Sequence, residues 1–353
     1  MVRGTRGNGA EGSARRRSAT QSVTLRDVAE RAGVSSQTVS RVLRVPDEVS
    51  APTRERVERA IRECGYVPNL AARNLASNRS KIVATVIPSL SASIFSETLT
   101  GLSSVLSPAG YQLLLGYTDY DDELEEALIR SLLGRRPDGF VMTGAIHRDS
   151  VVTMLRESGV PVVETWDWTD SPVDLLVGFS NQDAMYAMVS FLHDHGYQRP
   201  CFVGSLLEGD HRSLRRLDGY RRAVAEFWPD SPERVVDAAP HPLTLESGAT
   251  LLDVARSAHP DADVLVFATD VYAGGAVLAA RSRGVRVPED VAITGFGDFE
   301  LSGMIQPGLT TVALPNATIG REAAELLLRR MRGEPPEETA VDLGFEIRRR
   351  ESA

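Results

Sequence analysis

Residues 35–41, SSQTVSR, gather hydroxyl, carboxamide and guanidinium groups in one short stretch. A glutamine such as Gln37 can form two hydrogen bonds with the edge of an adenine, and Arg41 lies four residues further along the chain. Serine is less selective, because its hydroxyl both donates and accepts. Side chains of these types in the first turns of a helix are typical of a helix that reads bases in the major groove.

Two helices separated by a turn are predicted to position this stretch. Thr24 and Asp27 have the spacing of a capping box, with Asp in place of the more usual Glu. Gly33 is expected to end the first helix, because the turn needs a backbone geometry that is costly for other residues. Ser35 can cap the second helix.

A third helix is predicted from about Ala51 to Cys64, capped by Ser50 and stopped by Gly65. Three short helices in residues 23–67 make a compact headpiece. The residues expected on its buried faces are Leu25, Val28, Ala29, Ala32, Val39, Val42, Leu43, Val57, Ala60 and Ile61.

The headpiece is flanked by two segments with few large apolar residues. Residues 1–22 are rich in Gly, Ser and Arg and are predicted to be a disordered tail. Residues 68–81, PNLAARNLASNRSK, hold helix formers but would be marginal as an isolated helix. We expect this linker to order when a partner is present.

Charge is distributed unevenly along the chain. The formal net charge is −9, but residues 1–80 hold fifteen Arg and eight acidic residues, so they carry +7 and the remainder −16. A basic head on an acidic body is typical of a nucleic-acid-binding module joined to another function. Chance variation of surface charge is the alternative interpretation.

Composition limits the class of protein. With 353 residues, 42% hydrophobic and 25% charged, the chain is long enough for two or three compact units. It has no run of about 18 apolar residues, and no apolar stretch follows the first arginines, so neither a membrane span nor a signal peptide is expected. Cys64 and Cys201 are predicted in different domains, which argues against a disulfide. We expect a cytoplasmic protein.

From Ile82 onward, strand-like apolar runs alternate with helical stretches. This alternation predicts an α/β body with parallel sheets covered on both faces, and the runs are too many for one sheet. We expect a first lobe of about 82–179 and 310–338 and a second of about 180–309 and 339–353. A cleft between them, beyond the carboxyl ends of the strands, is the expected ligand pocket. Strands are predicted at 82–88, 111–117, 139–144, 160–166, 174–180, 201–205, 264–270 and 291–297, and helices at 96–107, 122–133, 149–158, 181–195, 213–227, 246–258 and 272–283.

Several stretches resemble one known family. VTLRDVAERAGVSSQTVSRVLR and VSAPTRERVERAIRECGYVPNLAARNLA are similar, nearly continuously over residues 23–77, to the headpiece and hinge of the LacI/GalR bacterial transcription regulators. PDGFVMTG, RRLDGYRRA and FATDVYAGGAVLAARSRGVRVPEDVAITGFGD extend the resemblance into the body. It implies an all-α helix-turn-helix headpiece and an α/β body of two lobes of the periplasmic-binding-protein-like type I. VIPSLSASIFSETLTGL and DLLVGFSNQDA look most like the gluconate-utilisation repressors.

The resemblance implies roles in DNA binding. It places Ser36 and Gln37 at base-reading positions, and Leu75 as a wedge that each hinge helix of a dimer inserts into the minor groove. Two headpieces related by a twofold axis would read a palindromic operator, so we expect a homodimer. The alternative for the headpiece side chains is that they are ordinary capping and surface residues. The alternative for Leu75 is that it packs on the body. The remaining expected contacts are Thr24, Ser35, Thr38, Ser40, Arg41, Asn69, Ala72 and Arg73.

The resemblance also implies an effector pocket. Ile94 and Phe95 would line its first-lobe wall, and Arg216 would hold the carboxylate of a sugar acid with its bidentate fork. A structural ion pair of Arg216 with Asp218 or another acid is the alternative. Trp166 and Trp168 replace the family's usual small or acidic residues, which leaves the size of the ligand open. The other expected pocket residues are Glu164, Trp166, Phe179 and Asp270.

The predicted function is a transcription regulator, a repressor of a carbohydrate or sugar-acid operon that leaves its operator when a gluconate-like effector binds. Two questions stay open. The effector can release the operator or tighten its binding, and it can be a neutral sugar or a purine in place of a sugar acid. A solute-binding transport protein would need a secretion signal and no headpiece, and an enzyme would need convergent catalytic groups that the sequence does not show. Neither a cofactor nor a metal is expected, because GFGDF lacks the GxGxxG pattern and His193 and His195 do not share a helix face.

Overall fold

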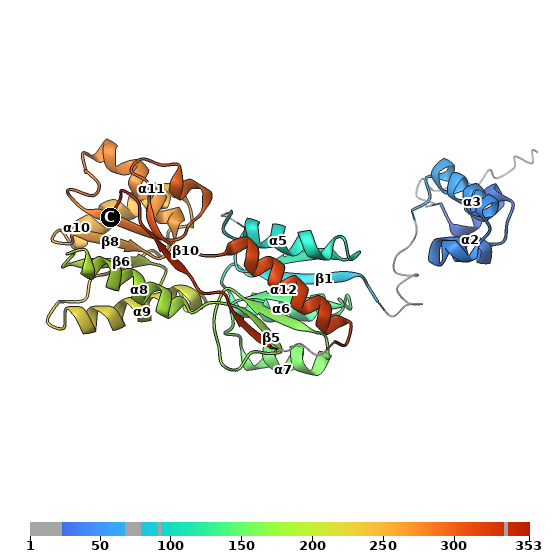
Figure 1. Ribbon diagram of the computed structural model, residues 1–353, viewed down its shortest axis with the longest axis horizontal. Coiled ribbons are helices and arrows are strands. Elements are labelled where there is room, and N and C mark those ends of the chain that lie inside the picture. Colours follow the sequence, from blue (N-terminus) through green and yellow to red (C-terminus); the bar gives the residue numbers. More distant parts are fainter. Residues whose placement is uncertain (1–22, 68–78, 91–92, 335–337) are drawn as a thin grey trace, which may run out of the picture. The chain divides into compact units, whose positions relative to one another are not determined.

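The computed structural model describes residues 23–67, 79–90, 93–334 and 338–353, which form two compact units divided between residues 78 and 79 (Figure 1). The first unit is a helical headpiece and the second is an α/β body. The predicted tail and residues 68–78 of the predicted hinge lie outside the described residues. None of the described helices combines the length and hydropathy that a membrane span requires.

The headpiece has the three predicted helices, α1 (Leu25–Ala32), α2 (Ser36–Arg44) and α3 (Ala51–Cys64), with a short 3₁₀ turn at Pro46–Glu48. The capping box forms: the backbone N–H of Thr24 donates to Asp27 over 2.8 Å, and the Asp27 N–H donates to the Thr24 hydroxyl. Gly33 ends α1 with a φ of 64°.

Ser50 is the exception among the predicted caps. Its hydroxyl bonds the Thr53 hydroxyl over 3.1 Å and no backbone N–H of α3. The headpiece core holds every residue expected there, with Leu25, Leu43 and Ile61 at its partly buried edge.

The first lobe of the body is a sheet of six parallel strands in the order β11-β5-β4-β3-β1-β2. Neighbouring residues of a strand face opposite sides, so Val83 packs under α5 and α12 while Ala84 packs under α6 and α7. The elements are β1 (Ile82–Ile87), β2 (Gln112–Tyr117), β3 (Gly139–Thr143), β4 (Val162–Thr165), β5 (Leu175–Gly178), β11 (Ala340–Asp342), a 3₁₀ turn (Ser93–Phe95), α5 (Ser96–Leu106), α6 (Asp122–Leu133), α7 (Asp149–Ser158) and α12 (Asn316–Met331).

The second lobe is a sheet in the order β12-β10-β9-β8-β6-β7, parallel except for β12. Helices α8 and α9 cover one face, and α10 and α11 cover the other. The elements are β6 (Pro200–Gly204), β7 (Val235–Asp237), β8 (Val264–Phe267), β9 (Ala292–Gly297), β10 (Thr310–Ala313), β12 (Glu346–Arg348), α8 (Asn181–Asp194), α9 (His211–Phe227), α10 (Leu245–Ala258), α11 (Asp270–Ala280), and 3₁₀ turns at Arg281–Arg283 and Glu300–Gly303.

The chain passes between the lobes three times, at residues 179–180, 314–315 and 343–345. The predicted lobe boundaries are wrong at two strands. β10 pairs with β9 in the second lobe, where the first was expected, and β11 pairs with β5 in the first lobe, where the second was expected. A strand near a crossing belongs to the lobe that contains its hydrogen-bonded neighbour. Hydropathy predicts the strand but does not show which strand it pairs with.

The start of the body is fixed to the amino-terminal edge of the first sheet. The backbone N–H groups of Ser80 and Lys81 each donate to the Asp138 carboxylate over 3.0 Å. The Lys81 ammonium lies 4.2 Å from the centre of the Tyr111 ring. Asp138 directly precedes β3, so the segment that enters the body is held to a central strand.

Two glycines let α5 and α12 cross at close range. A Cβ atom on Gly320 would lie 2.1 Å from the Thr98 carbonyl oxygen, and one on Gly101 would lie 2.3 Å from the Ala317 carbonyl oxygen. Backbone atoms on both sides leave little room for relaxation. The first lobe therefore depends on this contact.

We expect Gly320→Ala to lower the free energy of unfolding by about 1–3 kcal/mol, because the overpacking outweighs the better helix propensity of alanine. Urea unfolding followed by circular dichroism measures it. Gly134→Ala is the matched control, because its nearest neighbour atom would be 3.3 Å away. Equal stability of the Gly320 variant and the wild type would contradict the role of this helix contact.

Candidate DNA-binding and effector-binding sites

Helix α2 carries the predicted reading face. Ser36, Gln37 and Arg41 are exposed, and Gln37 and Arg41 lie on the side of α2 away from the buried Val39 and Val42. Positions four apart lie above one another on a helix, so Gln37 and Arg41 are neighbours. The face therefore has an amide and a guanidinium free to meet a partner.

The other predicted contacts in the headpiece are partly engaged. The hydroxyls of Ser35 and Thr38 bond each other over 2.9 Å, and the Thr24 hydroxyl donates to Asp27. Ser40 is half-buried on the same side of α2 as Ser36. The predicted hinge contacts Asn69, Ala72, Arg73 and Leu75 lie outside the described residues.

Positive charge is concentrated on α2. Residues 23–67 hold eight Arg and seven acidic residues, so the headpiece as a whole is nearly neutral. Helix α2 has Arg41 and Arg44 and no acid, whereas Glu30 and Glu63 pair with arginines of α1. The electrostatic attraction for an anionic partner is therefore directed to the reading face.

A cavity of about 370 Å³ lies within the body, lined from both lobes. Its walls come from residues that end or directly follow strands, such as Ser89 after β1, Trp166 after β4, Ser205 after β6 and Ala268 after β8. This agrees with the predicted position beyond the carboxyl ends of the strands. Of the predicted pocket residues, Ile94, Phe95, Trp166 and Arg216 line it.

A row of four aromatic rings runs beside the cavity from one lobe to the other. Phe95 meets Trp166 edge-on with ring centres 5.1 Å apart, and Phe179 lies 6.3 Å from both Trp166 and Phe296. The Trp166 indole N–H donates to the Thr98 hydroxyl over 3.1 Å, so it is already used. Phe179 is fully buried inside this row and does not line the cavity, although the resemblance implied that it is a pocket residue.

Arg216 is held firmly at one end of the row. Its Nε donates to Asn181 over 2.9 Å, its Nη1 donates to the Ala268 carbonyl over 2.6 Å, and its guanidinium lies 4.2 Å from the centre of the Phe296 ring. It forms no ion pair with Asp218 within the described chain. Burial, followed by the charge of Arg212, lowers the pKa of Arg216 to about 10, so it stays charged at neutral pH.

Arg212 stands at the other end of the row. It is 6% exposed, and its guanidinium lies 5.2 Å from the centre of the Phe95 ring. Among the described residues it has no hydrogen bond and no ion pair. Arg212 was not among the predicted pocket residues. The available signal was its spacing, because it lies four residues before Arg216 on α9 and side chains four apart share one face of a helix.

Several other polar residues line the cavity and were not predicted, including Asp119, Tyr120, Asp210, Ser213, His241 and Thr269. Most follow a strand or start a helix, which is where a ligand site in this fold recruits side chains. Burial, then the charge of Asp210, raises the pKa of Tyr120 to about 12, so its phenol stays protonated and can donate.

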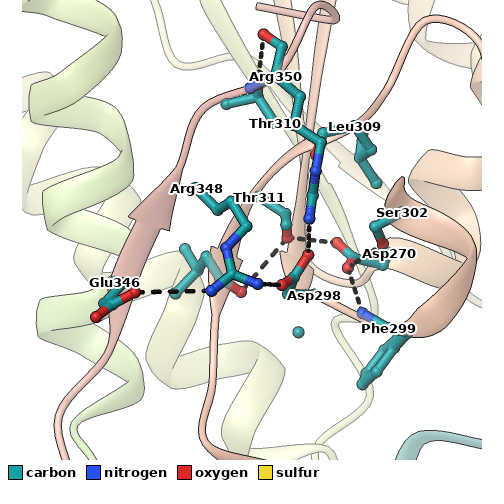
Figure 2. A network of polar contacts seen from close by, with 12 residues as sticks. Asp270, Asp298, Phe299, Ser302, Leu309, Thr310, Thr311, Glu346, Arg348 and Arg350 are labelled. Atoms are coloured by element: carbon teal, nitrogen blue, oxygen red, sulfur yellow. Dashed lines mark hydrogen bonds and ion pairs between the residues drawn. The ribbon is translucent and has the colours of Figure 1, made fainter. Parts of the chain in front are cut away.

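Asp270 does not line the cavity, although the resemblance implied that it is a pocket residue. Figure 2 shows its carboxylate accepting from the Phe299 N–H and from the hydroxyls of Ser302 and Thr311, over 3.0, 2.6 and 2.6 Å. Burial raises the pKa of Asp270 to about 6, against the lowering effect of these bonds. Asp270 therefore fixes the turn that carries Phe299, which itself lines the cavity.

Asp298 supports the same turn. Its carboxylate pairs with Arg348 and, over 2.7 Å, with Arg350, as Figure 2 shows. Both arginines come from the last crossing and its continuation. The cavity wall at residues 297–299 is thus attached to the strand that returns from the first lobe.

Glu164 is buried away from the cavity, contrary to the prediction. It accepts from the Val173 N–H over 2.6 Å and lies 3.4 Å from Nε2 of His147, whose Nδ1 is 3.0 Å from Glu125. Burial alone would lower the pKa of His147, but the hydrogen bond and charge of Glu125 and the charge of Glu164 raise it to about 10. The charge of His147 thus offsets the burial of Glu164 near the end of β4.

Within the described residues, no group of three or more His, Cys, Asp or Glu side chains is arranged to hold a metal ion. Cys64 and Cys201 are free thiols in separate units.

Comparison with known proteins matches both units. A family model described as bacterial regulatory proteins, lacI family, matches residues 24–69, and one described as a periplasmic binding protein-like domain matches residues 189–353. The chain is 39% identical to the HTH-type transcriptional regulator GntR of Pseudomonas aeruginosa, over 93% of this chain and 95% of that protein. The chain belongs to the LacI family. Its members are transcriptional regulators, so this protein is a DNA-binding regulator and not an enzyme.

Solved structures agree with this family assignment. A LacI-family regulator from Silicibacter pomeroyi has a TM-score of 0.87 and 36% identity, with 94% of this chain and 99% of that chain covered. A lac repressor dimer bound to operator and an anti-inducer has a TM-score of 0.77 and 27% identity, with 94% and 99% covered. In that lac repressor structure, both operator DNA and a small molecule are bound.

The His147 cluster predicts a pH dependence of stability. Because the pKa of His147 rises from an ordinary 6.5 to about 10 on folding, its protonation stabilises the fold fully below pH 6.5, and the effect is lost as pH rises toward 10. We expect His147→Gln to cost about 3–5 kcal/mol at pH 6 and much less at pH 10.

Urea unfolding at a series of pH values measures this difference, and an NMR titration of the imidazole gives the pKa directly. His259→Gln is the control, because His259 has no ion pair among the described residues. A cost of His147→Gln that is the same at pH 6 and pH 10 would contradict a charged His147.

Proposed function

We propose that the protein is a homodimeric repressor that acts in the cytoplasm, on the nucleoid, by binding a palindromic operator and leaving it when a sugar acid occupies the body. One observation carries the proposal: the exposed reading face of α2 is joined to a two-lobed body whose cavity holds two guanidinium groups. The operon regulated would serve the breakdown of a carbohydrate or sugar acid.

Exposed apolar side chains support a dimer. Leu278 of α11 and Met304 are 52% and 73% exposed. On the first lobe, Leu115 and Tyr117 are 41% and 51% exposed on β2, which is an edge strand. Large apolar side chains on an unpaired edge are normally covered, and a second copy of the chain would cover them on both lobes. Two headpieces would then be available for two half-sites.

The lobes supply the means of regulation. A ligand shifts a conformational equilibrium only by binding one state better than the other. The cavity is lined from both lobes, so a ligand in it favours the lobe arrangement that places Phe95 and Arg216 at the right separation. Operator affinity then depends on the ligand, and by linkage ligand affinity depends on the operator.

The cavity favours an anionic polyol. Arginine forks bind carboxylates, the tyrosine and hydroxyl groups suit a polyol, and the aromatic row provides a flat apolar wall. A gluconate-like sugar acid is the first candidate. A neutral sugar or a purine, and an effector that tightens operator binding, are outcomes that the experiment distinguishes.

We expect the full chain to shift a palindromic DNA fragment from upstream of its own gene in a mobility assay, and gluconate to reverse the shift at millimolar concentration or below. Release by gluconate but not by sorbitol or adenine supports the proposed effector class. Release by a neutral sugar or purine alone would replace it. A folded dimer that binds no such DNA at any salt concentration would overturn the repressor function.

We expect Gln37→Ala to weaken operator binding by about 1–3 kcal/mol and to relax the preference for the base that Gln37 reads. Titration of the variant against operators substituted at each half-site position measures both effects. Glu55→Ala, an exposed change on α3, serves as the control and should leave the base preference intact. Gln37→Ala with unaltered preference at every position would show that Gln37 does not read bases.

A further inference from the structure

We propose that Arg212 and Ser213 form the subsite for the acid group of the effector, and that Arg216 holds the polyol part. This inference rests on the proposed function and assigns the groups within its cavity. Resemblance alone gave the carboxylate to Arg216. The geometry favours the residue four positions earlier on the same helix.

Arg212 is a buried cation that forms no ion pair with any described residue. It is 6% exposed, lines the cavity and has no hydrogen bond or ion pair in the described part of the chain. Burying a charge is costly unless it is paired, and the face of Phe95 compensates only part of that cost. An anion in the cavity would provide the missing partner and could occupy the whole guanidinium fork.

Arg216 has little left to offer an anion. Two of its nitrogens donate to Asn181 and to the Ala268 carbonyl, and its face packs on Phe296. Only Nη2 is without a partner among the described residues. Such a group can still donate to a ligand hydroxyl, but each of its two-nitrogen edges includes a nitrogen that already donates within the protein.

Ser213 provides a second, independent sign of an anion. Its hydroxyl is buried without a hydrogen-bond partner, and the residue is 3% exposed and lines the cavity. Arg212 and Ser213 both lie in the first turn of α9, a helix of 17 residues. The amino-terminal end of a helix carries partial positive charge, so a carboxylate there meets a cation, a hydroxyl donor and the helix dipole together.

The acidic groups near Arg212 have other partners or lie without a direct contact to it, as far as the described residues show. Asp210 caps α9 by accepting from the Ser213 N–H over 3.2 Å, and Asp119 lines the cavity without an ion pair. In the small hollow that Arg212 also borders, Asp122 lies 3.6 Å from His211, and Glu125 lies 3.0 Å from His147. Asp121 accepts from two backbone N–H groups at the start of α6. No acid in either place forms an ion pair with Arg212.

Calorimetry on the full chain tests the assignment, with gluconate as the acid and sorbitol, its neutral counterpart, as the polyol. We expect the wild type to bind gluconate at least 50-fold more tightly than sorbitol, consistent with charge-assisted hydrogen bonds. Arg212→Met should remove most of this preference and leave sorbitol affinity within about threefold. Arg216→Met should weaken both ligands by similar factors. Ser213→Ala should weaken gluconate alone.

The thermal midpoint without ligand separates a binding role from a structural one. Because Arg212 has no partner in the protein, Arg212→Met should leave the midpoint unchanged or raise it. Arg212→Lys, which keeps the charge without the fork, should restore part of the gluconate preference. Equal weakening of both ligands by Arg212→Met, or selective loss of gluconate in Arg216→Met, would overturn the assignment.

Operator binding of the wild type separates this inference from the proposed function. We expect the wild type to shift the operator when no ligand is present. If the wild type shifts the operator and binds sorbitol but not gluconate, the acid subsite is wrong while the regulator stands. If no protein shifts the operator, the proposed function itself fails.

Discussion

The side chain of Asn181 holds together the part of the body on which the cavity depends. It is 1% exposed, directly after the first crossing, and donates to the Trp166 carbonyl and to Asp167 while accepting from Arg216. Trp166 and Asp167 follow a strand of the first lobe, and Arg216 belongs to a helix of the second. One amide therefore fixes the aromatic wall and the guanidinium relative to each other. A change in the angle between the lobes must act on these bonds, so this crossing sets the geometry that any ligand meets.

Local features of this chain were predictable because their causes are local. The capping box at Thr24 and the turn at Gly33 need only neighbouring residues, and the alternation of strands and helices needs only hydropathy. Glu164 and Asp270 show where prediction from local sequence fails. Each sits at or beside the end of a strand, as a ligand group would, but their partners His147 and Thr311 are far away in sequence. Whether an acid faces a cavity or a buried donor depends on the packing of distant parts of the chain. The choice of the sheet that β10 joins depends on that packing too.

Arg212 shows the opposite case, a functional candidate without a strong local signal. In the sequence it is one of several arginines around residue 215, and charge runs are usually solvated. Only the fold distinguishes them, because it buries Arg212 and leaves it unpaired while it gives Arg216 two acceptors. Net charge misleads in a similar way. The headpiece is nearly neutral, and much of the basic excess of residues 1–80 lies outside residues 23–67, so the positive charge of α2 comes from the placement of its arginines.

The route from the cavity to the headpiece runs along the first sheet. β1 has Lys81 at its amino-terminal end and leads to Ser89 in the cavity wall, and β3 starts directly after Asp138, which binds the backbone of Ser80 and Lys81. Hydrogen-bonded central strands deform little, so the lobe moves as one piece when its angle to the other lobe changes. In the proposed dimer, each body would pass such a movement to the backbone at Ser80 and Lys81, which gives a ligand in the body a means of controlling whether both half-sites are bound at once.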